Sequence, residues 1–172
     1  MELNKAIEER YSVRKFKKEQ ITEAEMKEVL SVLKHSPTAL NYQPLRIYDI
    51  KSEWGMNHIN EASKCIYGAP EVLMVCYDET QMWRNPLIRG HKSGPLDVAI
   101  AVDEIMLKAW DMGIGTCCVG LFSDKDLQKR FKLPEYIIPT LLIPIGYPAD
   151  DCKPLAKMHN VSKELDEMVF EL

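Results

Sequence analysis

The chain of 172 residues is 46% hydrophobic and 28% charged, so it can bury a core and has the length of one domain rather than two. Its 22 Lys and Arg residues against 26 Asp and Glu residues give a net charge of −4, which excludes nucleic-acid binding through a general basic surface. No apolar run reaches the roughly 18 residues of a membrane span, and the charged N-terminus does not have the pattern of a signal peptide. We therefore expect a single cytoplasmic domain over residues 1–172 that binds neither nucleic acid nor a membrane.

Two amphipathic helices are predicted before the first strand. Apolar residues recur at helical spacing over residues 3–11, with Asn4 available as the N-cap. Thr22 and Glu25 form a capping box, and the apolar stripe that follows stops before Ser36. The second helix is therefore expected between Thr22 and Ser36.

The next part of the chain contains the first two predicted strands. Residues 45–50 have strand character, residues 52–65 form a weaker helical pattern, and residues 71–77 (EVLMVCY) indicate a strand buried on both faces. Residues 78–94 carry Pro and Gly without any period, which predicts a long surface loop.

Helices and extended segments alternate over the rest of the chain. The strongest helical stripe begins near Ser93 and Pro95 and is ended by Gly113. This interleaving predicts a layered α/β domain with one sheet. The remaining expected elements are an extended segment at 116–121, a helix capped by Ser123 that reaches Phe131, a buried strand at 140–145 and an amphipathic stretch at 162–170.

Arg10, Ser12 and Arg14 follow directly on the first helix. Two guanidinium groups with a hydroxyl between them suit a phosphate, because arginine offers forked donors that match phosphate oxygens. The alternative is a solvated basic turn that continues into the following lysines.

Two further segments have a functional and a conformational interpretation. Residues 36–44 (SPTALNYQP) carry hydroxyl and amide side chains that could meet the polar edge of a ring, but Asn and Pro are also favoured in ordinary turns. Residues 113–120 (GIGTCCVG) would let a ligand approach the backbone closely, but glycine also ends helices.

Other familiar catalytic and binding motifs are absent from the sequence. It contains no Walker A motif, no G-x-G-x-x-G after a strand and no G-x-S-x-G elbow. Five cysteines without a C-x-x-C pair and four histidines indicate neither a disulfide framework nor a metal site. For Cys117 and Cys118, a nucleophilic Cys-His pair remains an alternative to buried, inert thiols.

Taken together, these segments resemble the nitroreductase family of FMN-dependent oxidoreductases, small-subunit type. The match covers nearly the whole chain, and the ordered set is specific although each motif alone is weak. The five motifs are RYSVRKF at 10–16, SPTALNYQP at 36–44, GIGTCCVG at 113–120, PIGYPAD at 144–150 and AKMH at 156–159.

The resemblance implies an α+β fold of three α-β-α layers around a central mixed, largely antiparallel sheet. It also implies a homodimer with composite sites for non-covalent FMN, and NADH or NADPH as the electron donor. The implied cofactor-binding residues are Arg10, Ser12, Arg14, Lys157 and His159 at the phosphate, Pro37, Thr38, Ala39 and Asn41 from the other subunit, and Cys118, Val119 and Gly120 with backbone amides near flavin N5.

The implied activity is hydride transfer from NAD(P)H to flavin N5, followed by electron transfer to a nitroaromatic, a quinone or a similar small-molecule acceptor. No second nucleotide fold is present to hold NAD(P)H beside the acceptor, so a ping-pong mechanism is expected. The flavin carries the chemistry, and no side chain is nominated as a catalytic acid or base. The alternatives are a flavin-binding protein without turnover and a related flavoenzyme such as a reductive dehalogenase.

Three features of the sequence concern the edges of such a site. His159 stands where the family usually has arginine, so FMN affinity is expected to depend on pH, because histidine changes its charge near neutral pH. Trp83 and Arg84 could stack on or pair with an acceptor, so the 78–94 loop is expected to border the substrate channel; the alternative is a mobile loop without a role. Apolar residues in the C-terminal arm, residues 160–172, are expected to pack on the partner subunit, or else on their own.

Overall fold

A computed structural model describes residues 2–172 of the chain. It is built from helices, short 3-10 segments and strands in an order close to the one predicted. In chain order these are α1 (Leu3–Glu9), α2 (Glu23–Leu30), η1 (Ser31–Lys34), η2 (Ala39–Asn41), β1 (Leu45–Ile50), α3 (Glu53–Ala62), β2 (Glu71–Asp78), α4 (Gly94–Asp111), β3 (Gly115–Thr116), α5 (Asp124–Phe131), β4 (Ile137–Gly146), α6 (Ala156–His159) and η3 (Leu165–Glu167).

The strands form one sheet in the order β1-β2-β4-β3. All of its strand pairs are antiparallel, and the register of β2 against β4 shifts between Val75 and Cys76. Within residues 2–172, parallel pairing is limited to an isolated bridge between Ser12 and Thr116. The largely antiparallel sheet expected from the resemblance is confirmed.

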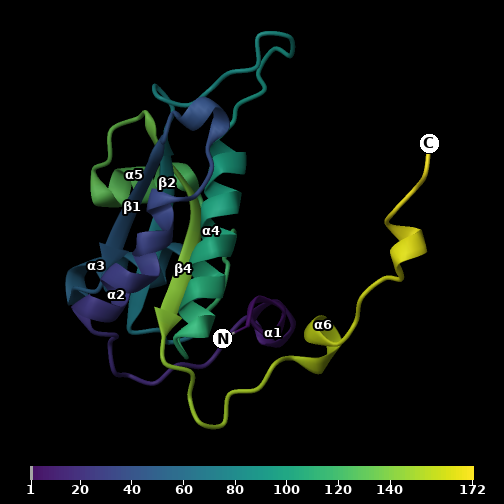
Figure 1. The fold of residues 1–172 in the computed structure, drawn as a ribbon. Coiled ribbons are helices and arrows are strands. Elements are labelled where there is room, and N and C mark those ends of the chain that lie inside the picture. Colours follow the sequence, from purple (N-terminus) through teal and green to yellow (C-terminus); the bar gives the residue numbers. More distant parts are fainter. Residues whose placement is uncertain (1) are drawn as a thin grey trace.

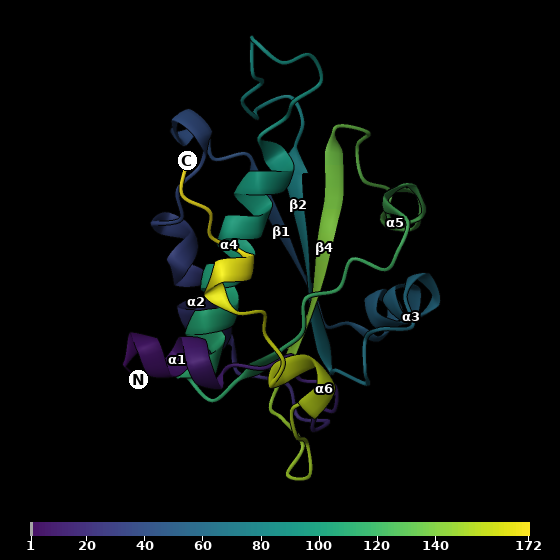
Figure 2. The same cartoon turned by 90° about the vertical axis from the view of Figure 1, so that its right-hand side faces the viewer.

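Helices cover both faces of this sheet and make three layers (Figures 1 and 2). α2 and α4 lie on one face, and α3 and α5 lie on the other. β2 is buried on both faces, with alternate residues in two separate apolar clusters, as its uninterrupted apolar sequence predicted. Val72, Met74 and Cys76 pack toward α3 and α5, whereas Leu73 and Val75 pack toward α2 and α4.

Local signals in the sequence set several helix ends as predicted. The Thr22 hydroxyl accepts a hydrogen bond from the Glu25 amide, and the Glu25 carboxylate accepts one from the Thr22 amide, which completes the capping box. The Ser123 side chain caps α5. The N-cap of α1 is Glu2 rather than Asn4, so that prediction was wrong.

The C-terminal arm differs from its prediction. Residues 162–170 do not form an amphipathic helix; they contain only the 3-10 turn η3, and all of residues 160–172 are exposed. The arm extends away from the body of the domain (Figure 1), so no neighbouring surface in the same subunit buries its apolar side chains. Phe170, for example, is 75% exposed.

Two general expectations can be compared with the described residues. None of the helices within residues 2–172 is long and apolar enough to cross a membrane. The five cysteines are unpaired, and no group of metal-binding side chains is found in this part of the chain.

Candidate functional site

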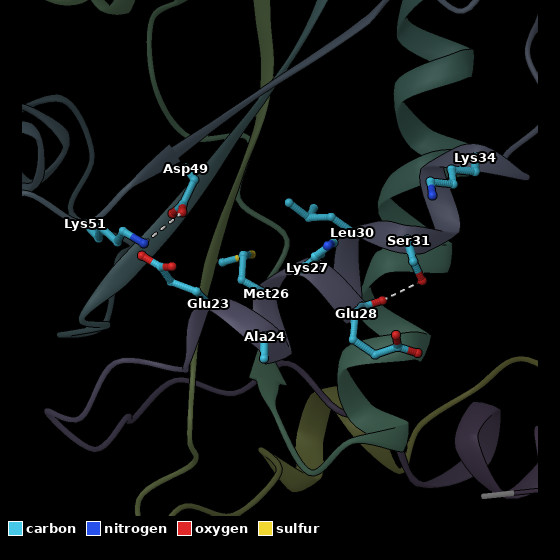
Figure 3. A pocket seen from close by; sticks show the side chains of 10 residues that line it. All are labelled: Glu23, Ala24, Met26, Lys27, Glu28, Leu30, Ser31, Lys34, Asp49 and Lys51. Atoms are coloured by element: carbon cyan, nitrogen blue, oxygen red, sulfur yellow. Dashed lines mark hydrogen bonds and ion pairs between the residues drawn. The ribbon is translucent and has the colours of Figure 1, made fainter.

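One large cavity in the described part of the chain does not coincide with the predicted site residues. It has a volume of about 690 Å³ and lies between α2, η1 and the end of β1 (Figure 3). Carboxylates and ammonium groups alternate around it, and Lys51 pairs with Asp49 at 3.6 Å between Nζ and Oδ2. Because its charges compensate one another, this cavity favours no ion of either sign.

A smaller cavity of about 160 Å³ gathers the first predicted motif and the end of the chain, and is called the cationic cavity here. Arg10, Ser12 and Arg14 line one side of it, and His159 on α6 lines the other. Its size is below the roughly 300–1,000 Å³ of whole ligand pockets, so it can enclose one polar group of a larger ligand. The full lining is Arg10, Tyr11, Ser12, Arg14, Leu155, Met158 and His159.

The spacing of the motif explains why its polar side chains converge. α1 ends at Glu9, and the chain continues in an extended conformation in which the Val13 amide donates to the Thr116 carbonyl oxygen at 2.9 Å. Side chains alternate along extended backbone, so Val13 points into the core and is fully buried. Ser12 and Arg14 then face the cavity.

The positive charge of this cavity has no carboxylate partner within residues 2–172. Arg46, Arg84 and Arg130 each form an ion pair, but no carboxylate lies within ion-pair distance of Arg10 or Arg14. Two half-buried guanidinium groups that converge without an anion indicate an anion-binding site.

Lys157 does not share this position. It lies two residues before His159 on α6, so the two side chains leave the helix on nearly opposite sides, and only His159 lines the cavity. The structure therefore does not bring Lys157 into the cationic cavity, and its contact with a phosphate stays a prediction.

The glycine-rich segment leads from the cationic cavity along the edge of β4. Gly115 is required by close packing, because a Cβ atom there would lie 2.7 Å from Val13. The amides of Cys117 and Val119 donate to Pro144 and Leu142 of β4. The prediction that the Val119 amide faces a ligand is therefore wrong.

The backbone amides of Cys118 and Gly120 have the opposite orientation to those of Cys117 and Val119. Successive N–H groups of extended backbone point to opposite sides, so those of Cys118 and Gly120 point away from β4. Neither has a hydrogen-bond acceptor within residues 2–172. They are the amides of this segment that can donate to a ligand.

The thiol chemistry of this segment is unfavourable for nucleophilic catalysis. Cys117 is buried, and burial raises the pKa of its thiol, with only partial opposition from Arg14. A thiol of raised pKa is not a thiolate at neutral pH. The inert interpretation of Cys117 is favoured.

The segment around Pro37–Asn41 lies at the other end of α4. The Ala39 amide donates to Asp97 Oδ1 at 3.0 Å at the start of α4, whereas Tyr11 packs on Trp110 at its end, with ring centroids 5.2 Å apart. At about 1.5 Å per helical residue, these two contacts are separated by roughly 20 Å along the helix. One subunit therefore does not bring this segment to its own cationic cavity.

This distant segment has a strained backbone. Leu40, Asn41 and Gln43 have φ values of 51°, 56° and 51°, in the left-handed region that non-glycine residues seldom adopt. Two hydrogen bonds hold this conformation: the Gln43 amide donates to Thr38 Oγ1, and Gln43 Nε2 donates to Asn41 Oδ1. Such strain is found most often at functional sites.

The predicted 78–94 loop is long and protrudes at the same end of α4 (Figures 1 and 2). Its ends, Asp78 and Gly94, belong to β2 and α4, and most of the residues between them are exposed, although Met82 and Ser93 are buried. Within the loop, the backbones of Arg84 and Lys92 form an isolated antiparallel β-bridge, and both side chains form ion pairs with the Glu79 carboxylate. Trp83 packs on His91 with ring centroids 6.4 Å apart. Neither Trp83 nor Arg84 reaches the cationic cavity.

Sequence reasoning missed one residue that lines the cationic cavity and one that lies beside its Arg14 side chain. Tyr11 lies inside the motif and lines the cavity, and its hydroxyl donates to the Cys152 carbonyl at 3.4 Å. Tyr67, from the turn between α3 and β2, lies under the Arg14 guanidinium. The only local signal was the turn-forming Gly68, which carries no information about Arg14.

Comparisons with known proteins agree on one family. A family model described as the nitroreductase family matches residues 7–66 and 57–147. The chain is 26% identical over 158 residues to a Methanothermobacter thermautotrophicus protein named as an NADH dehydrogenase/NAD(P)H nitroreductase, covering 88% of this chain and 80% of that one. It is 22% identical over 166 residues to an NAD(P)H-dependent FMN reductase of Bacillus subtilis, covering 87% and 67% of the two chains. A nitroreductase family protein from Clostridium difficile, known from its crystal structure, superimposes with a TM-score of 0.91 at 26% identity, over 100% of this chain and 99% of the other.

Proposed function

The chain belongs to the nitroreductase family, and from this premise we propose that it is a single-domain cytoplasmic oxidoreductase that binds FMN non-covalently and uses NADH or NADPH. Its acceptor is a nitroaromatic, a quinone or a similar small molecule, reduced by a ping-pong mechanism. The observation that carries the proposal is the cationic cavity, with its two guanidinium groups that lack a carboxylate partner within residues 2–172.

The residues of this cavity fit a terminal phosphate monoester. Arg10 and Arg14 supply charged donors and Ser12 a hydroxyl, and the cavity of about 160 Å³ has room for a phosphate group. His159 adds a ring N–H donor on the opposite side of the cavity. These four residues hold the phosphate and thereby fix one end of FMN.

The segment from Thr116 to Gly120 positions the other end. At about 3.3 Å per extended residue, it leads roughly 13 Å away from the phosphate residues. The amides of Cys118 and Gly120 donate to the ring edge and stabilise negative charge there. When bound, FMN supplies the redox chemistry, accepting a hydride from the nucleotide and passing electrons to the acceptor.

The site is completed by a second subunit in a homodimer. Pro37, Thr38, Ala39 and Asn41 contact the flavin of the partner, which is supported by their separation from their own cationic cavity and by the strain in this segment. The exposed apolar side chains of the C-terminal arm pack on the partner subunit. Both contacts bury surface that a lone subunit leaves in water.

The 78–94 loop borders the substrate channel. Its aromatic and cationic side chains, Trp83 and Arg84, contact a flat or anionic acceptor. The ion pairs of Arg84 and Lys92 with Glu79 keep the base of the loop closed.

The first test identifies the flavin. The purified protein is denatured, and the released compound is identified by chromatography; FMN is expected because the cavity accommodates one phosphate. Recovery of FAD, or an apoprotein that does not bind FMN, would contradict the proposal.

The second test separates an enzyme from a flavin-binding protein without turnover. Steady-state rates are measured at several fixed acceptor concentrations, and parallel double-reciprocal lines are expected because the oxidised nucleotide leaves before the acceptor enters. Protein reduced without nucleotide should also reduce the acceptor. Intersecting lines would contradict the proposal that nucleotide and acceptor use the same site in turn. If neither nucleotide reduces the flavin, the alternative of a flavin-binding protein without turnover is favoured.

A further inference from the structure

The turn that connects α3 to β2 places an aromatic side chain beside Arg14 of the cationic cavity. The Arg14 Cζ atom lies 5.9 Å from the centroid of the Tyr67 ring, within the roughly 6 Å over which a cation and a ring face attract each other. Tyr67 is only partly buried, and neither sequence pattern nor family motif assigned it a role.

The backbone of Tyr67 is strained. Its φ angle of 58° lies in the left-handed region, which is unusual for a bulky aromatic residue. Ile66 and Ala69 on either side are buried, and the Ala69 amide donates to the Ile66 carbonyl at 3.1 Å. These anchors hold the turn in place and direct the tyrosine ring to Arg14. A strained residue held by its surroundings points to a functional constraint.

The contacts of Arg14 leave part of its guanidinium available. Its Nη1 atom donates to the Ser12 carbonyl at 3.3 Å, and its Cζ atom lies over the Tyr67 ring. A guanidinium carries five N–H donors, so contacts with Ser12 and Tyr67 leave donors that can bind a phosphate oxygen. Tyr67 thus restricts the orientation of Arg14 and leaves N–H groups of the guanidinium available.

The phenol of Tyr67 does not neutralise the charge of Arg14. Burial raises the pKa of this phenol, and a hydrogen bond with Cys65 adds to the effect, while a hydrogen bond with Arg14 opposes it. The phenol is therefore neutral at neutral pH, and the charge of Arg14 stays available to a bound anion.

We infer that Tyr67 is a positioning residue that presents Arg14 to the phosphate of the flavin and so favours FMN over riboflavin, which lacks the phosphate. This inference rests on the proposed function, because it deepens the role of the same cavity. It assigns Tyr67 to recognition of the phosphate rather than of the ring.

The test compares two flavins on three proteins. Dissociation constants of FMN and riboflavin are measured by fluorescence titration of the full-length protein freed of flavin, for the native chain, Tyr67→Leu and Tyr67→Phe. Tyr67→Leu removes the ring face and should weaken FMN about 3- to 10-fold while leaving riboflavin unchanged. Tyr67→Phe keeps the ring and should stay within about twofold of the native protein.

A double-mutant cycle with Arg14→Gln tests whether Tyr67 acts through Arg14. In that background, Tyr67→Leu should cause little further loss of FMN affinity, because the group that it orients is gone. Equal weakening of both flavins by Tyr67→Leu, or additive losses in the cycle, would overturn the inference, since a purely structural role predicts those results.

A third probe separates this inference from the proposed function. Inorganic phosphate is titrated into the same flavin-free proteins by calorimetry. A native chain that binds phosphate but not FMN would refute the proposed function, and a loss of phosphate binding in Tyr67→Leu would then still support the role of Tyr67. Phosphate binding that is absent from the native chain, or unchanged in Tyr67→Leu, would refute the role of Tyr67.

Discussion

Replacing Glu71 by glutamine should stabilise the protein at neutral and alkaline pH. Glu71 begins β2, is 1% exposed, and its Oε2 atom has no hydrogen-bond partner in the described part of the chain. Burial raises the pKa of this carboxyl to about 8, a hydrogen bond with Asp49 and the charge of Asp49 add to the rise, and Lys51 opposes it. Glutamine keeps the shape and an N–H donor for Asp49 but cannot ionise.

The size of the effect follows from the two pKa values. In the unfolded chain the pKa of this glutamate is near 4.5, so the carboxyl is ionised at pH 7 and must take up a proton on folding. The free energy of that protonation is set by the distance of pH 7 from 4.5, about 2.5 pH units. At 1.36 kcal/mol per unit, the cost is on the order of 3 kcal/mol. Because the folded-state pKa is raised, the stabilising contribution of protonated Glu71 is fully present below pH 4.5 and is lost as pH rises toward 8.

The measurement is the free energy of unfolding by urea between pH 4.5 and 8.5. Protein concentration and excess FMN are held constant, because ligand and subunit binding both shift apparent stability. The advantage of Glu71→Gln should be near its minimum at the acidic end and grow with pH. Glu135→Gln is the matched control, since this side chain is exposed and should show no such trend. If the difference between Glu71→Gln and the native protein is the same at pH 5 and pH 8, Glu71 titrates as an ordinary carboxyl and the reasoning is refuted.

Three further predictions concern the proposed cofactor site and its surroundings. Arg14→Ala should weaken FMN binding by about 1.5–3 kcal/mol, the scale of a hydrogen bond to a charged group, whereas Arg130→Ala, whose native charge is already compensated, should leave the titrated affinity unchanged. Deletion of residues 160–172 should give dissociated or flavin-poor protein by light scattering and absorbance, and a fully loaded dimer after deletion would contradict the role of the arm. Trp83→Ala and Arg84→Ala should each lower kcat/KM severalfold for at least one acceptor; unchanged values for every acceptor tested would remove the loop from the substrate channel.

Features that depend on neighbouring residues in the chain could be predicted from the sequence. The capping box at Thr22 satisfies backbone groups within one helical turn, so its pattern is visible locally. β2 has nearly continuous apolar character because both of its faces are buried, and the observed strand begins at the predicted Glu71. Arg10, Ser12 and Arg14 could be singled out from the donor chemistry of the local sequence, and the structure brings these three side chains to one cavity. Their phosphate-binding role stays a prediction.

Features that depend on which segments meet were decided only by the tertiary structure. The Val119 amide is used by β4, and a strand partner 23 residues away leaves no mark on the local sequence. The C-terminal arm has apolar residues near helical spacing but no surface in its own subunit to bury them, so the helix does not form. Tyr67 reaches Arg14 because buried neighbours fix its turn beside the first motif. Local patterns specify how a segment folds and what chemistry it carries, whereas contacts between distant segments arise from packing of the whole core, which decides which of those groups act together.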